Sequence, residues 1–267
     1  MVRNPAVAGQ FYTDDVVALR AELTAFVKSM VPKETAVGII APHAGYIYSG
    51  AVAGEVYGSV VVPRTVIILG PNHHGLGARA ALYTDGQWLT PLGAVPIDAR
   101  LAALVKKHAP FVQADTSAHA LEHSLEVQVP FLQHIRPDVA IVPICLGFGD
   151  FATCASLGMA LAAAIGEFAE PVLIVASSDM THYESAEAAR NKDDLALNEV
   201  LALNPEGLLS ICRTHGITMC GVVPAVVMLV AAKALGASQA RLVRYATSGD
   251  VTGDNRQVVA YAGVTVV

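Results

Sequence analysis

The chain has 267 residues, of which 54% are hydrophobic and 15% charged, and its formal net charge at pH 7 is −6. This composition predicts a large buried core and, without any run of Lys or Arg, argues against nucleic-acid binding. Residues 1–5 lead into no apolar segment of the kind found in signal peptides. The longest apolar run, 221–235, is interrupted by Pro224 and Lys233 and is shorter than the ~20 residues of a membrane span. We therefore expect a cytoplasmic protein that does not enter membranes.

Apolar runs of strand length alternate with stretches of helical periodicity. Helices are expected at 14–30, 49–60, 98–108, 151–167, 185–203, from 205, and at 221–235. Strands are expected at 36–41, 65–69, 139–146, 171–176, 241–245 and 258–267, and a β-hairpin at 79–97 around the turn Asp85-Gly86. The charged residues of the helix at 185–203, which are Arg190, Lys192, Asp193 and Asp194, are expected on a solvated face. The pattern predicts an α/β fold: a single domain over 1–267, with a mostly parallel central sheet, helices on both faces and a β-hairpin insertion.

Polar, metal-capable side chains follow four of the predicted strands. They are His43, His73 with His74, Asp179 with His182, and Asp250. The carboxyl ends of parallel strands meet at one edge of the sheet, and open α/β sheets place their sites there. We therefore expect these side chains to converge.

Two imidazoles and a carboxylate form a ligand set that suits non-haem Fe(II), and also zinc or copper. His43 and His73 are the expected ligand pair, with Asp250 or Asp179 as the carboxylate. His182, left unligated, is a candidate base because the pKa of histidine lies near neutral pH. A single histidine after a strand is also common as a cap or surface residue, and Ser-Gly-Asp250 equally fits an ordinary turn.

One motif points to a different chemistry. His119-Ala-Leu-Glu-His123 fits H-x-x-E-H, a short zinc-peptidase signature in which Glu122 would be the base. Nearby Thr and Ser residues predict a helix start close to Glu122, which argues against one helix carrying both histidines. We interpret His123 as pointing into the site and His119 as a loop residue, and keep a zinc hydrolase as the weaker alternative.

The four cysteines have no C-x-x-C spacing, which argues against a cysteine zinc site or redox pair. They are Cys145, Cys154, Cys212 and Cys220. We interpret them as reduced and buried, although Cys220 also fits a position facing a cleft.

Five ordered motifs resemble the Memo family, whose prokaryotic members are the AmmeMemoRadiSam system protein B. They are Ala41-Pro-His-Ala-Gly-Tyr46, Ile68-Leu-Gly-Pro-Asn-His-His74, Glu122-His-Ser-Leu-Glu126, Ser177-Ser-Asp-Met-Thr-His182 and Thr218-Met-Cys-Gly221. Memo proteins are in turn similar to class III extradiol ring-cleaving dioxygenases of the LigB type, which use Fe(II). The resemblance also implies a pathway shared with AMMECR1-like and radical-SAM proteins.

By this resemblance His43 and His73 are metal ligands, His182 is the base with Asp179 beside it, and His123 is a further site histidine. Animal Memo proteins have a cysteine near the third metal position, where this chain reads Ser248-Gly-Asp-Val-Thr252. Asp250 is the nearest carboxylate and would favour Fe(II). The implied function is an oxidoreductase acting on a small chelating, diol-like substrate. The alternative is a metal- or redox-handling, or partner-binding, Memo protein without catalysis.

Overall fold

The central sheet is parallel in its middle, and an antiparallel pair on each side joins this middle to the outer strands. The computed structural model describes residues 1–28 and 32–267. Within them the main sheet has the order β10-β12-β2-β9-β3-β8-β4-β7, and β11 pairs with β12. Its strands are β2 (Gly38–Ala41), β3 (Thr65–Pro71), β4 (Ala80–Leu82), β7 (Gln113–Ala114), β8 (Ala140–Leu146), β9 (Val172–Ser177), β10 (His182–Glu184), β11 (Ala240–Thr247) and β12 (Val258–Val266). The neighbours β2-β9-β3-β8 run parallel, which confirms the predicted α/β class.

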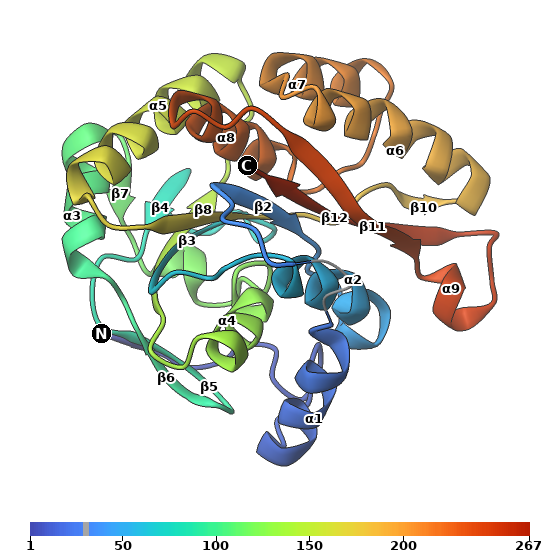
Figure 1. Ribbon diagram of the computed structural model, residues 1–267, viewed down its shortest axis with the longest axis horizontal. Coiled ribbons are helices and arrows are strands. Elements are labelled where there is room, and N and C mark those ends of the chain that lie inside the picture. Colours follow the sequence, from blue (N-terminus) through green and yellow to red (C-terminus); the bar gives the residue numbers. More distant parts are fainter. Residues whose placement is uncertain (29–31) are drawn as a thin grey trace.

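Helices cover both faces of this sheet (Figure 1). On one face lie α3 (Ala99–His108), α5 (Phe151–Phe168), α6 (Ala186–Leu201), α7 (Pro205–Thr214) and α8 (Val222–Ala234). On the other lie α1 (Val16–Phe26), α2 (Tyr46–Gly58) and α4 (Val129–Ile135), and the short α9 (Gly249–Thr252) follows β11. A small separate sheet contains β1 (Val2–Arg3), β5 (Gln87–Thr90) and β6 (Gly93–Pro96).

Alternate residues of each central strand enter two different cores. Ile67 and Leu69 of β3 pack under α5 and α8, whereas Val66 and Ile68 pack towards α2 and α4. Successive side chains of a strand point to opposite faces, so burial on both faces requires a continuous apolar run. This is why the strands read as unbroken runs of Val, Ile and Leu.

Two local details of the helices differ from the predictions. Helix α1 begins at Val16, two residues later than expected, and Asp15 is its N-cap because its side chain accepts a hydrogen bond from the Ala18 amide. The end expected near Met30 falls outside the described residues. Asp193 of α6 is fully buried rather than solvated, because it accepts hydrogen bonds from Thr181 and from the hydroxyl of Tyr245.

The hairpin insertion is present, but its turn lies elsewhere. β5 pairs antiparallel with β6, whereas β4 joins the main sheet beside β8. The chain therefore turns back after Thr90, and Asp85-Gly86 instead connects the two sheets. Gly86 is the residue that permits this connection, because its φ is +91° and a Cβ there would overlap the backbone of Met1.

Within the described residues, α5 is the one helix of sufficient length and apolar character to suit a membrane span. It packs against α3 and α8 and buries Leu157 and Leu161 in the core beneath it. This is the position of a core helix in a layered α/β fold.

Candidate metal centre

The carboxyl ends of three neighbouring strands supply the first side chains of the site. His43 lies two residues past the end of β2, His73 two residues past β3, and Asp179 two residues past β9. These strands are adjacent and parallel in the order β2-β9-β3, so their ends share one edge. The predicted convergence of His43, His73 and Asp179 follows from this order.

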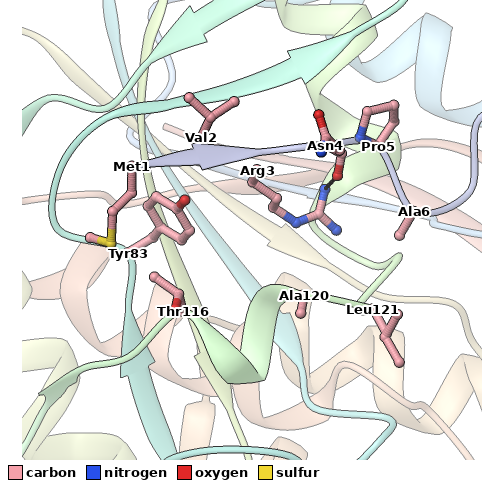
Figure 2. Close-up of a pocket in the computed structure, with 10 residues that line it drawn as sticks. All are labelled: Met1, Val2, Arg3, Asn4, Pro5, Ala6, Tyr83, Thr116, Ala120 and Leu121. Carbon is pink, nitrogen blue, oxygen red and sulfur yellow. Dashed lines mark hydrogen bonds between the residues drawn. The ribbon is translucent and has the colours of Figure 1, made fainter.

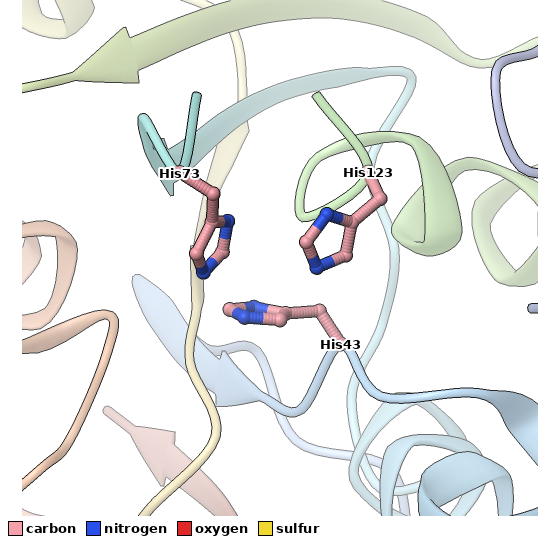
Figure 3. Close-up of side chains that lie close together, drawn as sticks. All are labelled: His43, His73 and His123. Atoms are coloured by element: carbon pink, nitrogen blue, oxygen red, sulfur yellow. The ribbon is translucent and has the colours of Figure 1, made fainter. Parts of the chain in front are cut away.

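Three imidazoles face one another at this edge (Figure 3). Ligand atoms of His43, His73 and His123 all lie within 4.8 Å of one another, close enough for one metal ion. The ring centroids of His73 and His123 are 4.6 Å apart, and that of His43 lies 5.2 and 5.5 Å from them. His123 comes from the loop between two short 3₁₀ helices, η1 (Ser117–His119) and η2 (Glu126–Gln128).

A buried carboxylate orients His73. Glu122, 1% exposed, accepts hydrogen bonds from Nδ1 of His73 at 2.8 Å, from the His73 amide at 2.7 Å and from the Ser124 amide at 2.9 Å. Burial raises its pKa, but the hydrogen bond and charge of His73 and the hydrogen bonds of Ser124 together outweigh this and hold the pKa of Glu122 well below its usual range. An ionised carboxylate only accepts, so Nδ1 of His73 carries the hydrogen and Nε2 keeps its lone pair.

His43 is held in the same tautomer. Its Nδ1 lies 3.0 Å from Oγ of Ser177, and that hydroxyl donates to the Ser124 carbonyl at 2.6 Å. Ser177 therefore accepts from Nδ1, and Nε2 of His43 keeps a lone pair. Burial, followed by the neighbouring His73 and His123, holds the pKa of His43 well below its usual value. Neutral imidazoles with free Nε2 lone pairs are the form that binds a metal, so the donors fit a divalent cation.

Asp179 and His182 form another wall of the site. Asp179 is 4% exposed, and its Oδ1 accepts from the amides of His43 at 2.7 Å and Ala44 at 3.2 Å. Burial raises the pKa of Asp179 to about 6. The backbone of His182 is fixed by Thr218, and its Nδ1 is buried with no partner among the described residues. Both side chains face the cavity as predicted.

The cavity in front of the three histidines has a volume of about 770 Å³. Its wall combines the site histidines with aromatic, polar and acidic side chains. Besides His43, His73, His123, Asp179 and His182, it is lined by Phe11, Ala44, Gly45, Tyr48, Tyr183, Ser248, Thr252, Asp254, Gln257, Val258, Val259 and Tyr261. This size accommodates a small-molecule ligand.

The structure places His123, and not Asp250, with the two predicted ligands. Asp250 is exposed, and its Oδ2 accepts a hydrogen bond from the Thr247 amide at 2.7 Å. The carboxylate thus caps the end of its own loop and is absent from the cavity wall. The prediction erred because a Gly-Asp turn satisfies its carboxylate locally. His74 is exposed and lies outside the group, so of the two adjacent histidines it is His73 that joins His43 and His123.

Cys220 contacts a histidine of the site, which agrees better with the cleft-facing position than with simple packing, although it is not among the residues that line the cavity. Its Sγ lies 3.1 Å from Nε2 of His43 and accepts from the Asp179 amide at 3.3 Å. Gly221 permits this approach, because a Cβ there would overlap the Ser177 carbonyl oxygen and Ser178. Burial raises the pKa of the Cys220 thiol well above its usual value, so in the absence of a cation the thiol stays protonated. No strand precedes Cys220, and strand-end patterning therefore could not find it.

The zinc-peptidase geometry is not formed. His119 is fully buried and its Nε2 lies 3.1 Å from the Ala81 carbonyl oxygen, which makes it a core residue. His119 ends η1, while His123 lies in the following loop, so the two do not share a helix face. Glu122, already bonded to His73, is not placed as a free base.

A second cavity, of about 690 Å³, lies beside the N-terminal segment (Figure 2). Its one cationic side chain, Arg3, is fully engaged. The guanidinium donates to Glu126 at 2.7 Å, to the His119 carbonyl at 2.7 Å and to the Glu122 carbonyl at 2.8 Å. Arg3 therefore anchors the loop that carries His123 and offers no free charge to a ligand.

The fold and the site together define the class of protein. It is an α/β protein with an open sheet and a histidine cluster at the carboxyl edge of the parallel strands. Within that class the chain belongs to the Memo family, since the model of Memo-like proteins matches residues 3–265. It is 46% identical to a MEMO1 family protein of Aquifex aeolicus, over 98% of each chain. It is 42% identical to one of Methanopyrus kandleri, over 99% of this chain and 98% of the other.

A solved structure shares the fold at much lower sequence identity. The crystal structure of an uncharacterized protein of Escherichia coli K12 matches with a TM-score of 0.51 and 16% identity, covering 78% of this chain and 88% of that one. This similarity extends the sheet architecture to a distant protein.

Proposed function

We propose that the protein is a metal-dependent oxidoreductase in which His43, His73 and His123 hold a divalent cation, with Fe(II) as the favoured ion. When bound, Fe(II) supplies a Lewis-acidic, redox-active centre for a chelating, diol-like substrate and dioxygen. The observation that carries the proposal is the cluster of three ring nitrogens within 4.8 Å at the floor of a cavity of about 770 Å³.

Three neutral imidazoles differ from the two-histidine, one-carboxylate set expected from the sequence. Three neutral ligands do not offset the charge of a divalent cation. The nearest buried carboxyl group, Glu122, hydrogen-bonds to His73 and would not contact the cation itself. Such a centre favours a ligand that loses a proton on binding. Three histidines are also a known zinc set, so the donor atoms alone do not select Fe(II).

The protein's own groups can manage the proton that such a substrate gives up. His182 lines the cavity and is the proposed base. The pKa of Asp179, raised to about 6 by burial, lets this carboxyl hold or release a proton near neutral pH. The backbone amides of His43 and Ala44 fix Asp179 beside the ligand histidines, so the proton acceptors do not move with the substrate.

Cys220 supports a second candidate function, that of a protein that handles a soft or redox-active metal without oxygenation. A thiol 3.1 Å from Nε2 of His43 offers a sulfur donor beside one of the three histidines. Thiolate favours copper(I) or zinc over Fe(II) in an otherwise nitrogen site. A bound cation would also deprotonate the thiol despite its raised pKa.

Anaerobic titration of the metal-free protein with Fe(II) tests the centre. Removal of a residue that hydrogen-bonds to a metal ligand typically lowers metal affinity 10–100-fold. Loss of a ligand itself should cost more, so His43→Ala, His73→Ala and His123→Ala should each lower the affinity for Fe(II) more than about 100-fold. His74→Ala is the matched control, because this exposed neighbour lies outside the cluster, and Asp250→Ala should also bind normally. Full affinity in a folded His43→Ala/His73→Ala protein would contradict the proposal.

Two further measurements separate the candidate functions. With Fe(II) bound, oxygen uptake in the presence of a catechol panel supports the oxidoreductase, and its absence across the panel supports the metal-handling alternative. The copper(I) affinities of the wild type and of Cys220→Ala then test the metal-handling alternative. That alternative requires Cys220→Ala to bind copper(I) much more weakly than the wild type.

A further inference from the structure

The wall of the cavity in front of the three histidines contains no lysine or arginine side chain among the described residues. Asp179 and Asp254 contribute carboxylates to it. Arg256 lies near the rim, but its guanidinium donates to both carboxylate oxygens of Asp254, at 3.0 and 2.7 Å. Beneath the histidines lies the buried carboxyl group of Glu122, which accepts a hydrogen bond from Nδ1 of His73. An anionic group on a ligand, other than the one that binds the metal, would therefore meet no lysine or arginine that is free to pair with it.

Two tyrosines stand at the mouth of this cavity. Tyr48, in the first turn of α2, is 39% exposed, and Tyr183 of β10 is 74% exposed. Both line the cavity, and Phe11 and Tyr261 add aromatic surface to its wall. Exposed aromatic rings around a polar site provide faces that stack on an aromatic ligand or receive an organic cation.

The backbone at Tyr183 is arranged to place this ring. Its φ is +60°, in the left-handed region that side chains other than Gly rarely occupy. In the pairing of β10 with β12, His182 lies opposite Val259 and Glu184 lies opposite Val258. These two partners are consecutive in β12, so Tyr183 is the extra residue of a β-bulge in β10. Bulges next to sites re-aim a side chain, and strained residues cluster at functional positions. The ring of Tyr183 is mostly exposed and is not buried in the core.

We propose that the ligand of this site is an aromatic chelator which, apart from its chelating oxygens, is uncharged or cationic. Tyr48 and Tyr183 contact its ring, and the acidic cavity discriminates against rings that carry a carboxylate. This inference rests on the proposed function, because the chelating oxygens require the cation held by His43, His73 and His123.

Isothermal titration calorimetry on the zinc-loaded protein tests the charge preference, since zinc binds without turnover of the ligand. The probes are catechol, dopamine and 3,4-dihydroxybenzoate at about pH 7, which share the diol and differ in the charge of the remaining group. Dopamine should bind at least as tightly as catechol. 3,4-Dihydroxybenzoate should bind at least about tenfold more weakly, because its carboxylate faces like charges.

Variants test the contacts. Tyr48→Ala and Tyr183→Ala should each weaken catechol and dopamine about three- to tenfold, the effect of losing one aromatic contact, with zinc affinity unchanged. Tyr183→Lys adds a cation at the rim and should strengthen 3,4-dihydroxybenzoate binding relative to catechol. Phe111→Ala is the matched control, because this exposed aromatic residue lies outside the cavity lining.

The outcomes separate the two proposals. Metal analysis before each titration shows whether zinc is bound, and a wild-type protein that takes up no zinc overturns the proposed centre together with this inference. A zinc-loaded protein that binds catechol and 3,4-dihydroxybenzoate equally, or that binds none of the probes, overturns this inference alone. Loss of catechol binding in Phe111→Ala equal to that in Tyr183→Ala would also overturn it.

Discussion

Nδ1 of His73 lies 2.8 Å from Oε1 of Glu122, and this contact determines which nitrogen of the ring faces the candidate metal centre. Glu122 also accepts from the His73 amide, so one carboxylate fixes both the backbone and the ring of the ligand. Its neighbour in sequence, His123, supplies another ligand, and Nδ1 of that ring lies 3.5 Å from Glu122. One buried carboxyl group thus orients the ring of His73 and lies close to the ring of His123.

Glu122→Gln should lower the affinity for the divalent cation about 10- to 100-fold, the usual cost of removing an outer carboxylate partner. The glutamine side chain has one acceptor oxygen in place of two. It also carries no negative charge to hold the hydrogen on Nδ1 of His73. Metal affinity is measured by competition with a chelator, alongside Glu187→Gln, which changes an exposed glutamate of α6. Unchanged affinity in folded Glu122→Gln would contradict the orienting role.

His119 should make the metal-free protein less stable in acid. Burial, and then the charge of Arg3, lowers the pKa of His119 to about 4, compared with about 6.5 in an unfolded chain. Between about pH 6.5 and pH 4 the unfolded state binds a proton that the folded state does not, so the free energy of unfolding falls as the pH falls. The full contribution, for a difference of about 2.5 pKa units, is about 3 kcal/mol.

The corresponding measurement is urea unfolding of the wild type and His119→Gln at several pH values from about 8 to 4. The comparison at about pH 8, where His119 is neutral in both states, sets the baseline for the substitution itself. Below about pH 6.5 the wild type should lose more stability than the variant. Parallel pH profiles of the two proteins would rule out this titration as the cause.

The ion pair between Arg3 and Glu126 should be strongly coupled. The two side chains are 4% and 1% exposed, and Nη1 lies 2.7 Å from Oε2. Arg3→Met leaves a buried carboxylate without its cation and should destabilise the fold by about 3–5 kcal/mol. Since Glu126→Gln removes the same charge interaction, the double variant should cost less than the sum of the single ones. A double-mutant cycle from chemical unfolding measures this coupling, and additive effects would contradict it.

Gly221→Ala should destabilise the fold by about 1–3 kcal/mol, because a Cβ at this position overlaps the Ser177 carbonyl oxygen and Ser178. The same substitution at Gly166 of α5 meets nothing within 4 Å and should stabilise the protein by up to about 1 kcal/mol. Thermal unfolding of the two variants gives the comparison. Equal effects at the two positions would show that close approach at Gly221 is not required.

The apolar runs and the residues directly after them were sufficient to predict much of the centre. β2 and β3 read as strands because burial on both faces demands continuous apolar sequence, and His43 and His73 follow them directly. Parallel strands bring their carboxyl ends to one edge, so the convergence of these two histidines follows from local sequence and sheet geometry. Asp179 and His182 were found in the same way.

Tertiary structure alone decided the remaining members of the site. Cys220 reaches His43 only because Gly221 lets a loop after α7 approach the end of β9. Asp250 had the expected position in sequence, but its carboxylate is taken up by the Thr247 amide. Neither position could be predicted from a periodic pattern in the sequence, because both depend on contacts between side chains and backbone in loops.

The sequence by itself determined the long strands of the sheet and the two histidines that follow β2 and β3, since strand formation and side-chain alternation are local properties of the chain. The third imidazole was decided by long-range contacts. His123 lies in a loop held by Arg3, whose guanidinium binds the Glu122 carbonyl, and by Glu126, which binds the amides of Ala6 and Val7. These partners are more than a hundred residues away in sequence, and only the folded chain brings them together.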